Sequence, residues 1–269
     1  MSEQSKKKRK VYIPGKAVVL YMVLTAIVVG LIVGAIASRR PKPVEPSKFE
    51  LYEAAFKNSL VADEENVFPL ICLNDDQKVK MNDRGQVMLV IWNNSPYTYI
   101  AGESVTLAEG DVWAVTYQEM LGWFVKNYES VTADGWDLRL AQLMGKPPDN
   151  GYTYFATVWA YAGDVFRPAY HNDVNKSSMT TAFVGESDPT YEAWFNQTFV
   201  DKFMSKKEIW TRLGYTYDWN PKAKTIYGLT EFVIRQNAEV MVDERMANAV
   251  FAEKMVSRAR QAASAEPSP

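Results

Sequence analysis

The sequence predicts an α+β protein with a single N-terminal transmembrane helix followed by one mixed domain outside the cytoplasm. Two observations predict this fold class. Residues 17–38 form an apolar stretch without a charge, and beyond residue 48 short strand-like runs are interspersed irregularly with segments of helical periodicity. A doubly wound sheet would instead show a regular strand-helix rhythm with glycine-rich phosphate turns, which the sequence lacks.

The apolar stretch has the length of a membrane span. Its 22 residues would form an α-helix of roughly 33 Å, which matches a hydrocarbon core. Six basic residues and one acidic residue precede it, so the N-terminus is expected in the cytoplasm. A cleaved signal peptide is the alternative, because Ala35-Ile36-Ala37 has the form of a cleavage site. The stretch exceeds the usual apolar region of about 7–15 residues, which favours an uncleaved signal anchor.

Small residues recur every four positions along this span, at Ala26, Gly30, Gly34 and Ser38. Such a stripe lets two helix backbones approach closely. It therefore predicts packing against another copy of the chain or against a partner membrane protein. The alternative is that these residues, which are common in transmembrane helices, face lipid.

Composition divides the chain into five parts: a basic cytoplasmic tail (1–16), the signal-anchor helix (17–38), a proline-rich stalk (39–48), an α+β domain (49–260) and a disordered tail (261–269). Prolines make the stalk extended and semi-rigid. Beyond Pro43 there are 31 acidic and 21 basic residues, so the domain repels phosphate backbones. The predicted partners therefore include the lipid bilayer, through 17–38, and exclude nucleic acid.

In the first half of the domain, helical spacing of apolar residues predicts a helix over 49–61, and short apolar runs predict strands over 67–73, 87–92 and 111–115. Thr116 to Glu119 has the form of a capping box and predicts a helix from residue 117. A further helix over 135–144 should end at Gly145, ahead of two prolines.

In the second half, the aromatic run 152–161 is typical of a strand. Asp188 as N-cap and Pro189 at the first helical position predict another helix. Two strands over 212–219 and 225–235 should flank a turn at Asn220-Pro221. A last helix is expected over 242–260.

Few residues offer recognisable chemistry. One cysteine and one histidine cannot supply an intramolecular disulfide or a structural zinc site, and no nucleotide-binding or calcium-binding motif is present in the sequence. Cys72 lies in an apolar run and is expected to be packed and inert, while His171 lies in a polar loop and is expected to bond a turn or meet solvent. We predict no catalytic residue, no metal and no cofactor.

Carboxylates occur as sequence neighbours at 63–65, 75–76 and 243–244. A glycoside hydrolase needs two carboxyl groups that face each other across a cleft, and sequence neighbours rarely do so. These carboxylates are therefore interpreted as solvated groups in turns and at helix ends. Isolated candidates, which the sequence cannot pair, are Glu103, Asp164, Asp218 and Glu231.

Aromatic residues are the most unusual feature of the domain. All eight Trp, all 12 Phe and 13 of 15 Tyr lie beyond the stalk. They predict either a dense core or a groove whose exposed rings stack on sugars or a peptide. The candidate ligand-binding residues are Tyr152, Tyr154, Trp210, Arg212, Tyr215, Tyr217, Asp218 and Trp219.

Strand alternation sharpens the expectation for residues 212–219. Leu213, Tyr215, Tyr217 and Trp219 would share one face and are predicted to be buried. Arg212 and Asp218 would share the opposite face and are predicted to meet solvent or a ligand.

The block Trp-Thr-Arg-Leu-Gly-Tyr-Thr-Tyr-Asp-Trp over 210–219, followed by Gly228-Leu229-Thr230-Glu231-Phe232, resembles a group of uncharacterised bacterial envelope proteins. Segments 143–148 and 164–168 share the resemblance, which covers about residues 110–240. It implies one folded unit and carries no activity.

Two classes of function follow. The first is a single-pass bacterial envelope protein of the plasma membrane, whose periplasmic or extracellular domain binds a partner protein or cell-wall glycan as a scaffold. The second is a membrane-anchored envelope hydrolase that uses paired carboxylates. The absence of a nucleophile motif or metal-ligand cluster from the sequence favours the first class.

Overall fold

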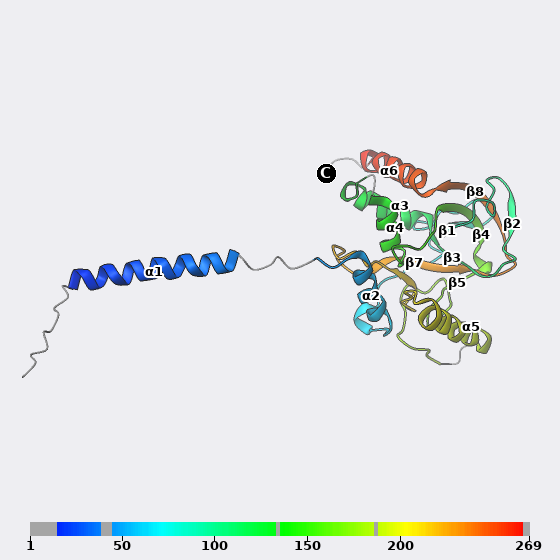
Figure 1. Cartoon of the computed structure of the whole chain (residues 1–269). Helices are drawn as coiled ribbons and strands as arrows, with labels where there is room; N and C mark the ends of the chain where they lie inside the picture. The colour runs from blue at the N-terminus through cyan, green and yellow to red at the C-terminus, as the bar shows by residue number, and fades with distance from the viewer. Residues whose placement is uncertain (1–14, 39–44, 133–134, 186–187, 266–269) are drawn as a thin grey trace, which may run out of the picture. The chain divides into compact units, whose positions relative to one another are not determined.

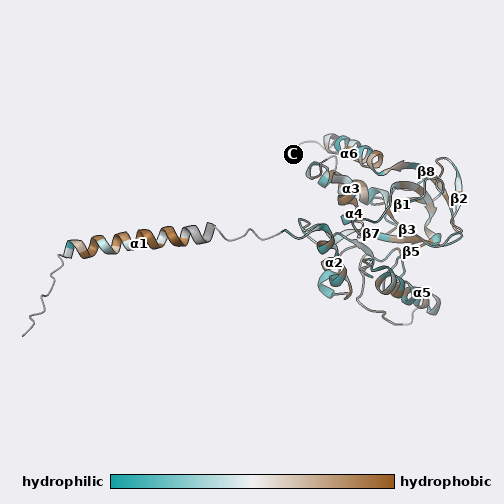
Figure 2. Ribbon diagram, viewed as in Figure 1, coloured by the Kyte–Doolittle hydropathy of each residue, from teal (hydrophilic) through white to brown (hydrophobic). Residues whose placement is uncertain are grey.

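A computed structural model describes residues 15–38, 45–132, 135–185 and 188–265, and side chains are not described for 34–38 and 265. Contacts divide the chain into two units, residues 1–45 and 46–269. The first unit contains helix α1 (Gly15–Ser38), whose residues are apolar along most of its length (Figure 2). Among the described residues, α1 is the one helix long and apolar enough to cross a membrane, a property that a signal sequence shares.

The second unit is built on one antiparallel sheet in the order β2-β8-β4-β1-β3-β7-β5 (Figure 1). Its strands are β1 (Gln86–Asn93), β2 (Ser104–Thr106), β3 (Val112–Thr116), β4 (Tyr154–Tyr161), β5 (Val165–Phe166), β7 (Tyr227–Ile234) and β8 (Glu239–Ala247). A short strand, β6 (Tyr215–Tyr217), pairs with β7 off this path. Sheet and helices together confirm the α+β class.

Helices cover one face of the sheet in two groups. The first group, α3 (Tyr117–Asn127), α4 (Trp136–Leu143) and α6 (Asn248–Ala265), packs on Val90, Trp92 and Phe155. The second group, α5 (Pro189–Phe199) with the π-helical turn Val200–Lys206, packs on Val233. Helix α2 (Lys48–Ser59) contributes to both apolar clusters, and Figure 1 shows α5 apart from α3, α4 and α6.

Loops cover the opposite face. Alternate strand residues such as Leu89, Ala156 and Phe232 form a second core there with loop residues such as Leu73 and Tyr99. On the helical face, Leu229 and Val233 of β7 belong to the two different clusters, and Glu231 lies between them in the strand. A carboxyl group therefore stands at the boundary between two apolar clusters.

Most elements with a strong local signal are confirmed: helices begin at 48, 117, 136 and 189, and strands lie at 86–93, 112–116, 154–161, 215–217 and 227–234. The Asp188 carboxylate caps α5 by accepting a hydrogen bond from the Thr190 N–H at 2.8 Å. The capping box of α3 does not form. The Thr116 side chain makes no capping bond, and Glu119 instead accepts from the Thr230 N–H at 2.8 Å, because the packing of β7 turns it inward.

Three expectations are wrong. Residues 67–73 form no strand. The N–H groups of Leu70, Ile71 and Leu73 instead bond to distant segments, for example Leu70 to the Ser177 carbonyl at 2.9 Å. Residues 242–247 belong to β8, because pairing with β4 outweighs their helical spacing. Helix α6 continues to Ala265, so 261–265 are helical, and the rest of the expected disordered tail lies outside the described residues.

Candidate functional site

The sheet opens between its two central strands. β1 and β3 pair only at Leu89 with Thr116 and at Val90 with Val115. Beyond this point β1 remains paired with β4 as far as Asn93, and β3 remains paired with β7 from Val112. The two strands therefore diverge while each stays anchored on its outer side, and a cavity of about 260 Å³ lies at the opening.

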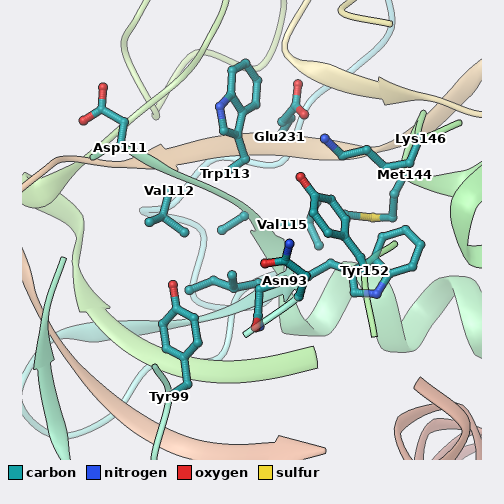
Figure 3. Close-up of a pocket in the computed structure, with 14 residues that line it drawn as sticks. Asn93, Tyr99, Asp111, Val112, Trp113, Val115, Met144, Lys146, Tyr152 and Glu231 are labelled. Carbon is teal, nitrogen blue, oxygen red and sulfur yellow. The ribbon is translucent and has the colours of Figure 1, made fainter. Parts of the chain in front are cut away.

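The cavity has aromatic walls and several polar groups (Figure 3). Its aromatic residues are Trp92, Tyr99, Trp113 and Tyr152, and its polar or charged residues are Asn93, Asn94, Asp111, Lys146 and Glu231. These side chains come from β1, β3, β7, the two loops on either side of β2, and the segment that connects α4 to β4. Such a mixture of apolar walls with a few convergent polar groups is typical of small-ligand sites.

Glu231 is the most perturbed acid that lines the cavity. Burial raises its pKa to about 7, against the opposing effects of Lys202 and Lys146. No hydrogen bond or ion pair joins its carboxylate to another residue in the part of the chain that the structure describes. The position of this side chain on a sheet face between two apolar clusters explains the shift, and its free carboxyl group is available to a ligand.

Two lysines and a second glutamate stand beside Glu231. The Lys202 ammonium lies 3.0 Å from the Glu208 carboxylate and 4.1 Å from the centre of the Trp113 ring, while the Lys146 ammonium lies 3.6 Å from Glu208. Burial opposes ionisation of Glu208, but the two lysines lower its pKa to about 2. Glu208 therefore stays ionised, and its charge offsets only one of the two lysines.

Two tyrosine hydroxyls at the cavity also lack partners among the described residues. Tyr99 is only 4% exposed, and burial raises its pKa to about 12. Tyr152 lies with its hydroxyl end toward Lys146 and Glu231 (Figure 3). Asp111, in contrast, is satisfied, because it accepts from the Trp194 indole N–H and from the Gln236 backbone N–H, both at 2.7 Å.

Of the eight candidate ligand-binding residues, the structure places Tyr152 at this cavity. Tyr154, two residues later on β4, is partly buried with Arg245 over its ring at 4.9 Å. Trp210, Arg212, Tyr215, Tyr217, Asp218 and Trp219 are each less than 9% exposed. The predicted burial of the row that ends at Trp219 is confirmed.

The expectation that Arg212 and Asp218 meet solvent or a ligand is wrong. Asp218 binds Arg139 through two hydrogen bonds of 3.0 and 2.6 Å, in a pair that is nearly fully buried. Arg212 has φ 59°, which breaks the strand alternation, and its guanidinium donates to the Ser59 carbonyl at 2.7 Å. Both side chains therefore organise the interior.

The other predicted groups behave as structural residues. Carboxylates that are neighbours in the sequence either cap turns or pair with lysine. The Asp63 carboxylate accepts a hydrogen bond from the Glu65 N–H at 3.1 Å, and Glu244 forms an ion pair with Lys254. His171 bonds a turn by accepting from the Asp173 N–H at 3.2 Å. Cys72 is half-buried and its thiol lies 3.3 Å from the Asn175 carbonyl. No group of three metal-ligating side chains occurs within the described ranges.

A second cavity contains Glu119, whose pKa is also raised by burial. This carboxylate is fully engaged, because it bonds the Tyr227 hydroxyl and the Thr230 N–H and hydroxyl. It therefore braces α3 against β7. In the first unit, Ala26 and Gly30 are exposed on α1, and the side chains of Gly34 and Ser38 lie outside the description.

The sequence identifies Glu231 as an isolated carboxylate but does not show which residues lie beside it in the fold. Its signal was a lone carboxylate between Leu229 and Val233 on an otherwise apolar strand face. No local pattern marked Lys146 or Lys202. Lys146 lines the cavity from the segment that connects α4 to β4, and Lys202 lies in the π-helical turn with its ammonium over the Trp113 ring.

Comparison with known proteins identifies no relative. No family model, no curated protein and no solved structure matches the chain. Function is therefore inferred from the cavity.

Proposed function

We propose that the protein is a single-pass envelope protein whose folded domain binds a glycan unit in the cavity between β1 and β3. The observation that carries this proposal is the cavity itself, which combines aromatic walls with unpartnered polar groups at Glu231, Tyr99 and Tyr152. Sugar rings present apolar faces to aromatic side chains and hydroxyls to polar groups. A volume of about 260 Å³ lies below the range of drug-sized sites, so the bound unit is small.

Membrane anchoring belongs to the same proposal. Helix α1 supplies a span of sufficient length, and the basic residues before it favour a cytoplasmic N-terminus, with the domain in the periplasm or outside the cell. Alkaline carbonate washing should leave the full chain in the membrane fraction, and its release would contradict anchoring.

The cavity favours glycan binding over the alternative of a hydrolase with paired carboxylates. Asp111, the other carboxylate in the lining, has each oxygen engaged by an N–H donor, and the sequence-adjacent carboxylates do not line this cavity. A hydrolase would need a second carboxyl group free to act on the ligand. Glu231 alone does not meet this requirement.

Two neighbouring tyrosines provide a matched test. The full chain in nanodiscs would be applied to an array of bacterial cell-wall and capsular glycans, together with Tyr152→Ala and Tyr154→Ala. Tyr152 lines the cavity and Tyr154 does not, so Tyr152→Ala should lose at least about fivefold in affinity, since stacking on one aromatic side chain contributes about 1–3 kcal/mol. Tyr154→Ala should bind within about twofold of wild type. No glycan binding by wild type, or equal loss in both variants, would contradict the proposal.

A further inference from the structure

The charge around the cavity depends on one proton. Glu208 is shared between the ammonium groups of Lys146 and Lys202 at 3.6 and 3.0 Å, and burial lowers the pKa of Lys202 while Glu208 opposes this effect. With both lysines protonated, the three groups together carry one positive charge. Glu231 in its ionised form cancels this charge, and in its protonated form leaves it uncompensated. The cavity thus gains a positive charge each time Glu231 takes up a proton.

The lysines are positioned for an anionic group. The Lys146 side chain extends along the cavity toward Glu231, with the Tyr152 hydroxyl beside it (Figure 3). Lys146 contacts the Tyr152 ring at 5.2 Å, and Lys202 covers a face of Trp113. A ligand cation would meet the Lys146 ammonium at this end, whereas a carboxylate would meet Lys146, a tyrosine hydroxyl and, once it is protonated, the Glu231 hydroxyl.

The remaining charged group in the lining is Asp111. It lies beyond Trp113 from Glu231, and its oxygens accept from Trp194 and Gln236 (Figure 3). This carboxylate keeps an anion away from that end of the cavity. The Lys146 end is therefore where a negative group can be held.

We infer that the glycan unit bound in the cavity is an acidic sugar, whose carboxylate is held at Lys146 and whose binding is coupled to the uptake of one proton by Glu231. The inference rests on the proposed function and specifies its ligand class. With Glu231 titrating near pH 7, binding should weaken as pH rises through neutrality, because the competent protonated form becomes scarce.

Matched sugar pairs test the ligand class. Ligand-observed NMR would measure dissociation constants of the full chain in nanodiscs for glucuronate and glucose, galacturonate and galactose, and N-acetylmuramate and N-acetylglucosamine. At pH 6 the acidic member of at least one pair should bind about tenfold more tightly than its neutral partner. From pH 6 to pH 8 its affinity should fall about tenfold, in proportion to the protonated fraction of Glu231.

Two variants separate the charges. Glu231→Gln should retain at pH 8 the affinity that wild type shows at pH 6, since the amide mimics the neutral acid. Lys146→Met should abolish the preference for the acidic sugar, while Lys57→Met, at an exposed ion pair of α2, should leave it unchanged. The Lys146 carbonyl, which accepts from Trp219 at 2.9 Å, is unaffected by this substitution.

The outcomes distinguish the two proposals. Neutral sugars that bind as tightly as acidic ones, with dependence on Tyr152, would overturn the acidic assignment and leave glycan binding intact. Binding of neither class would overturn both. The peptide carboxylate N-acetylalanylalanine, if it bound as tightly as the best acidic sugar, would overturn the sugar assignment in favour of a peptide terminus. Affinity that is unchanged from pH 6 to pH 8 would overturn the proton coupling.

Discussion

The segment 210–219 and the cavity between β1 and β3 are both rich in aromatic residues, but their polar groups differ. In the segment, the Trp210 indole donates to Pro168 and the Trp219 indole to Lys146, each at 2.9 Å, while Asp218 pairs with Arg139. At the cavity, the Glu231 carboxyl and the Tyr99 hydroxyl have no such partners among the described residues. The first region is therefore core, in which the Arg212 Nε is a buried polar atom without a hydrogen bond in the described part of the chain, whereas the second has polar groups that face a cavity.

This difference teaches that aromatic density does not identify a binding surface. A buried polar group without a partner is costly to the folded state, so an unpaired one at a cavity indicates a site better than an abundance of rings. Six of the eight candidate residues are aromatic, and of the eight only Tyr152 lies at the cavity. Three predictions test the contrast between the two regions.

The largest effect is expected at the buried ion pair. Asp218→Ala should lower the free energy of unfolding by about 3–5 kcal/mol, because it leaves the Arg139 guanidinium buried and unpaired. Denaturant unfolding followed by tryptophan fluorescence would measure it. The double variant Arg139→Met with Asp218→Leu should cost less than Asp218→Ala alone. A loss below about 1 kcal/mol would show that Asp218 behaves as a surface residue.

A smaller, pH-dependent effect is expected at Glu231. Its folded-state pKa of about 7 lies above the ordinary value of 4.5, so wild type loses stability as pH rises through this window, by about 3 kcal/mol in all. Glu231→Gln cannot ionise at this position and lacks this loss. Its free energy of unfolding relative to that of wild type should therefore rise by the same amount between pH 4 and pH 8. Unfolding measured at each pH unit tests this, with the exposed Glu239→Gln as control. If the free energies of unfolding of wild type and Glu231→Gln changed in parallel with pH, the pKa of Glu231 would not be raised in the folded protein.

The smallest effects concern two hydroxyls. Tyr215→Phe should cost about 1 kcal/mol, because its hydroxyl donates to the Asn66 carbonyl at 2.8 Å. Tyr99→Phe removes a hydroxyl without a partner and should change stability by less than about 0.5 kcal/mol. Thermal melts of both variants provide the comparison. An equal or larger cost for Tyr99→Phe would mean that its hydroxyl is engaged in the free protein.

Local sequence was sufficient for elements whose signals lie within a few residues. Asp188 with Pro189 specified the start of α5, and the short continuous apolar run 87–92 specified β1. Both depend on backbone geometry and short-range periodicity, which are present in the chain before it folds. The α+β class and the single apolar N-terminal helix follow from the same kind of information.

Tertiary structure decided the conformation of residues for which a local interaction competes with pairing to a distant segment. Glu119 could cap α3 but bonds β7 instead, and 242–247 could be helical but pair with β4. Tertiary structure also decided the candidate site. Lys146 and Glu231 are far apart in the chain, and both line the cavity that lies where β1 and β3 diverge after two paired positions. The chain determines which residues face each side of the sheet, whereas strand pairing between remote segments determines which of them share a cavity.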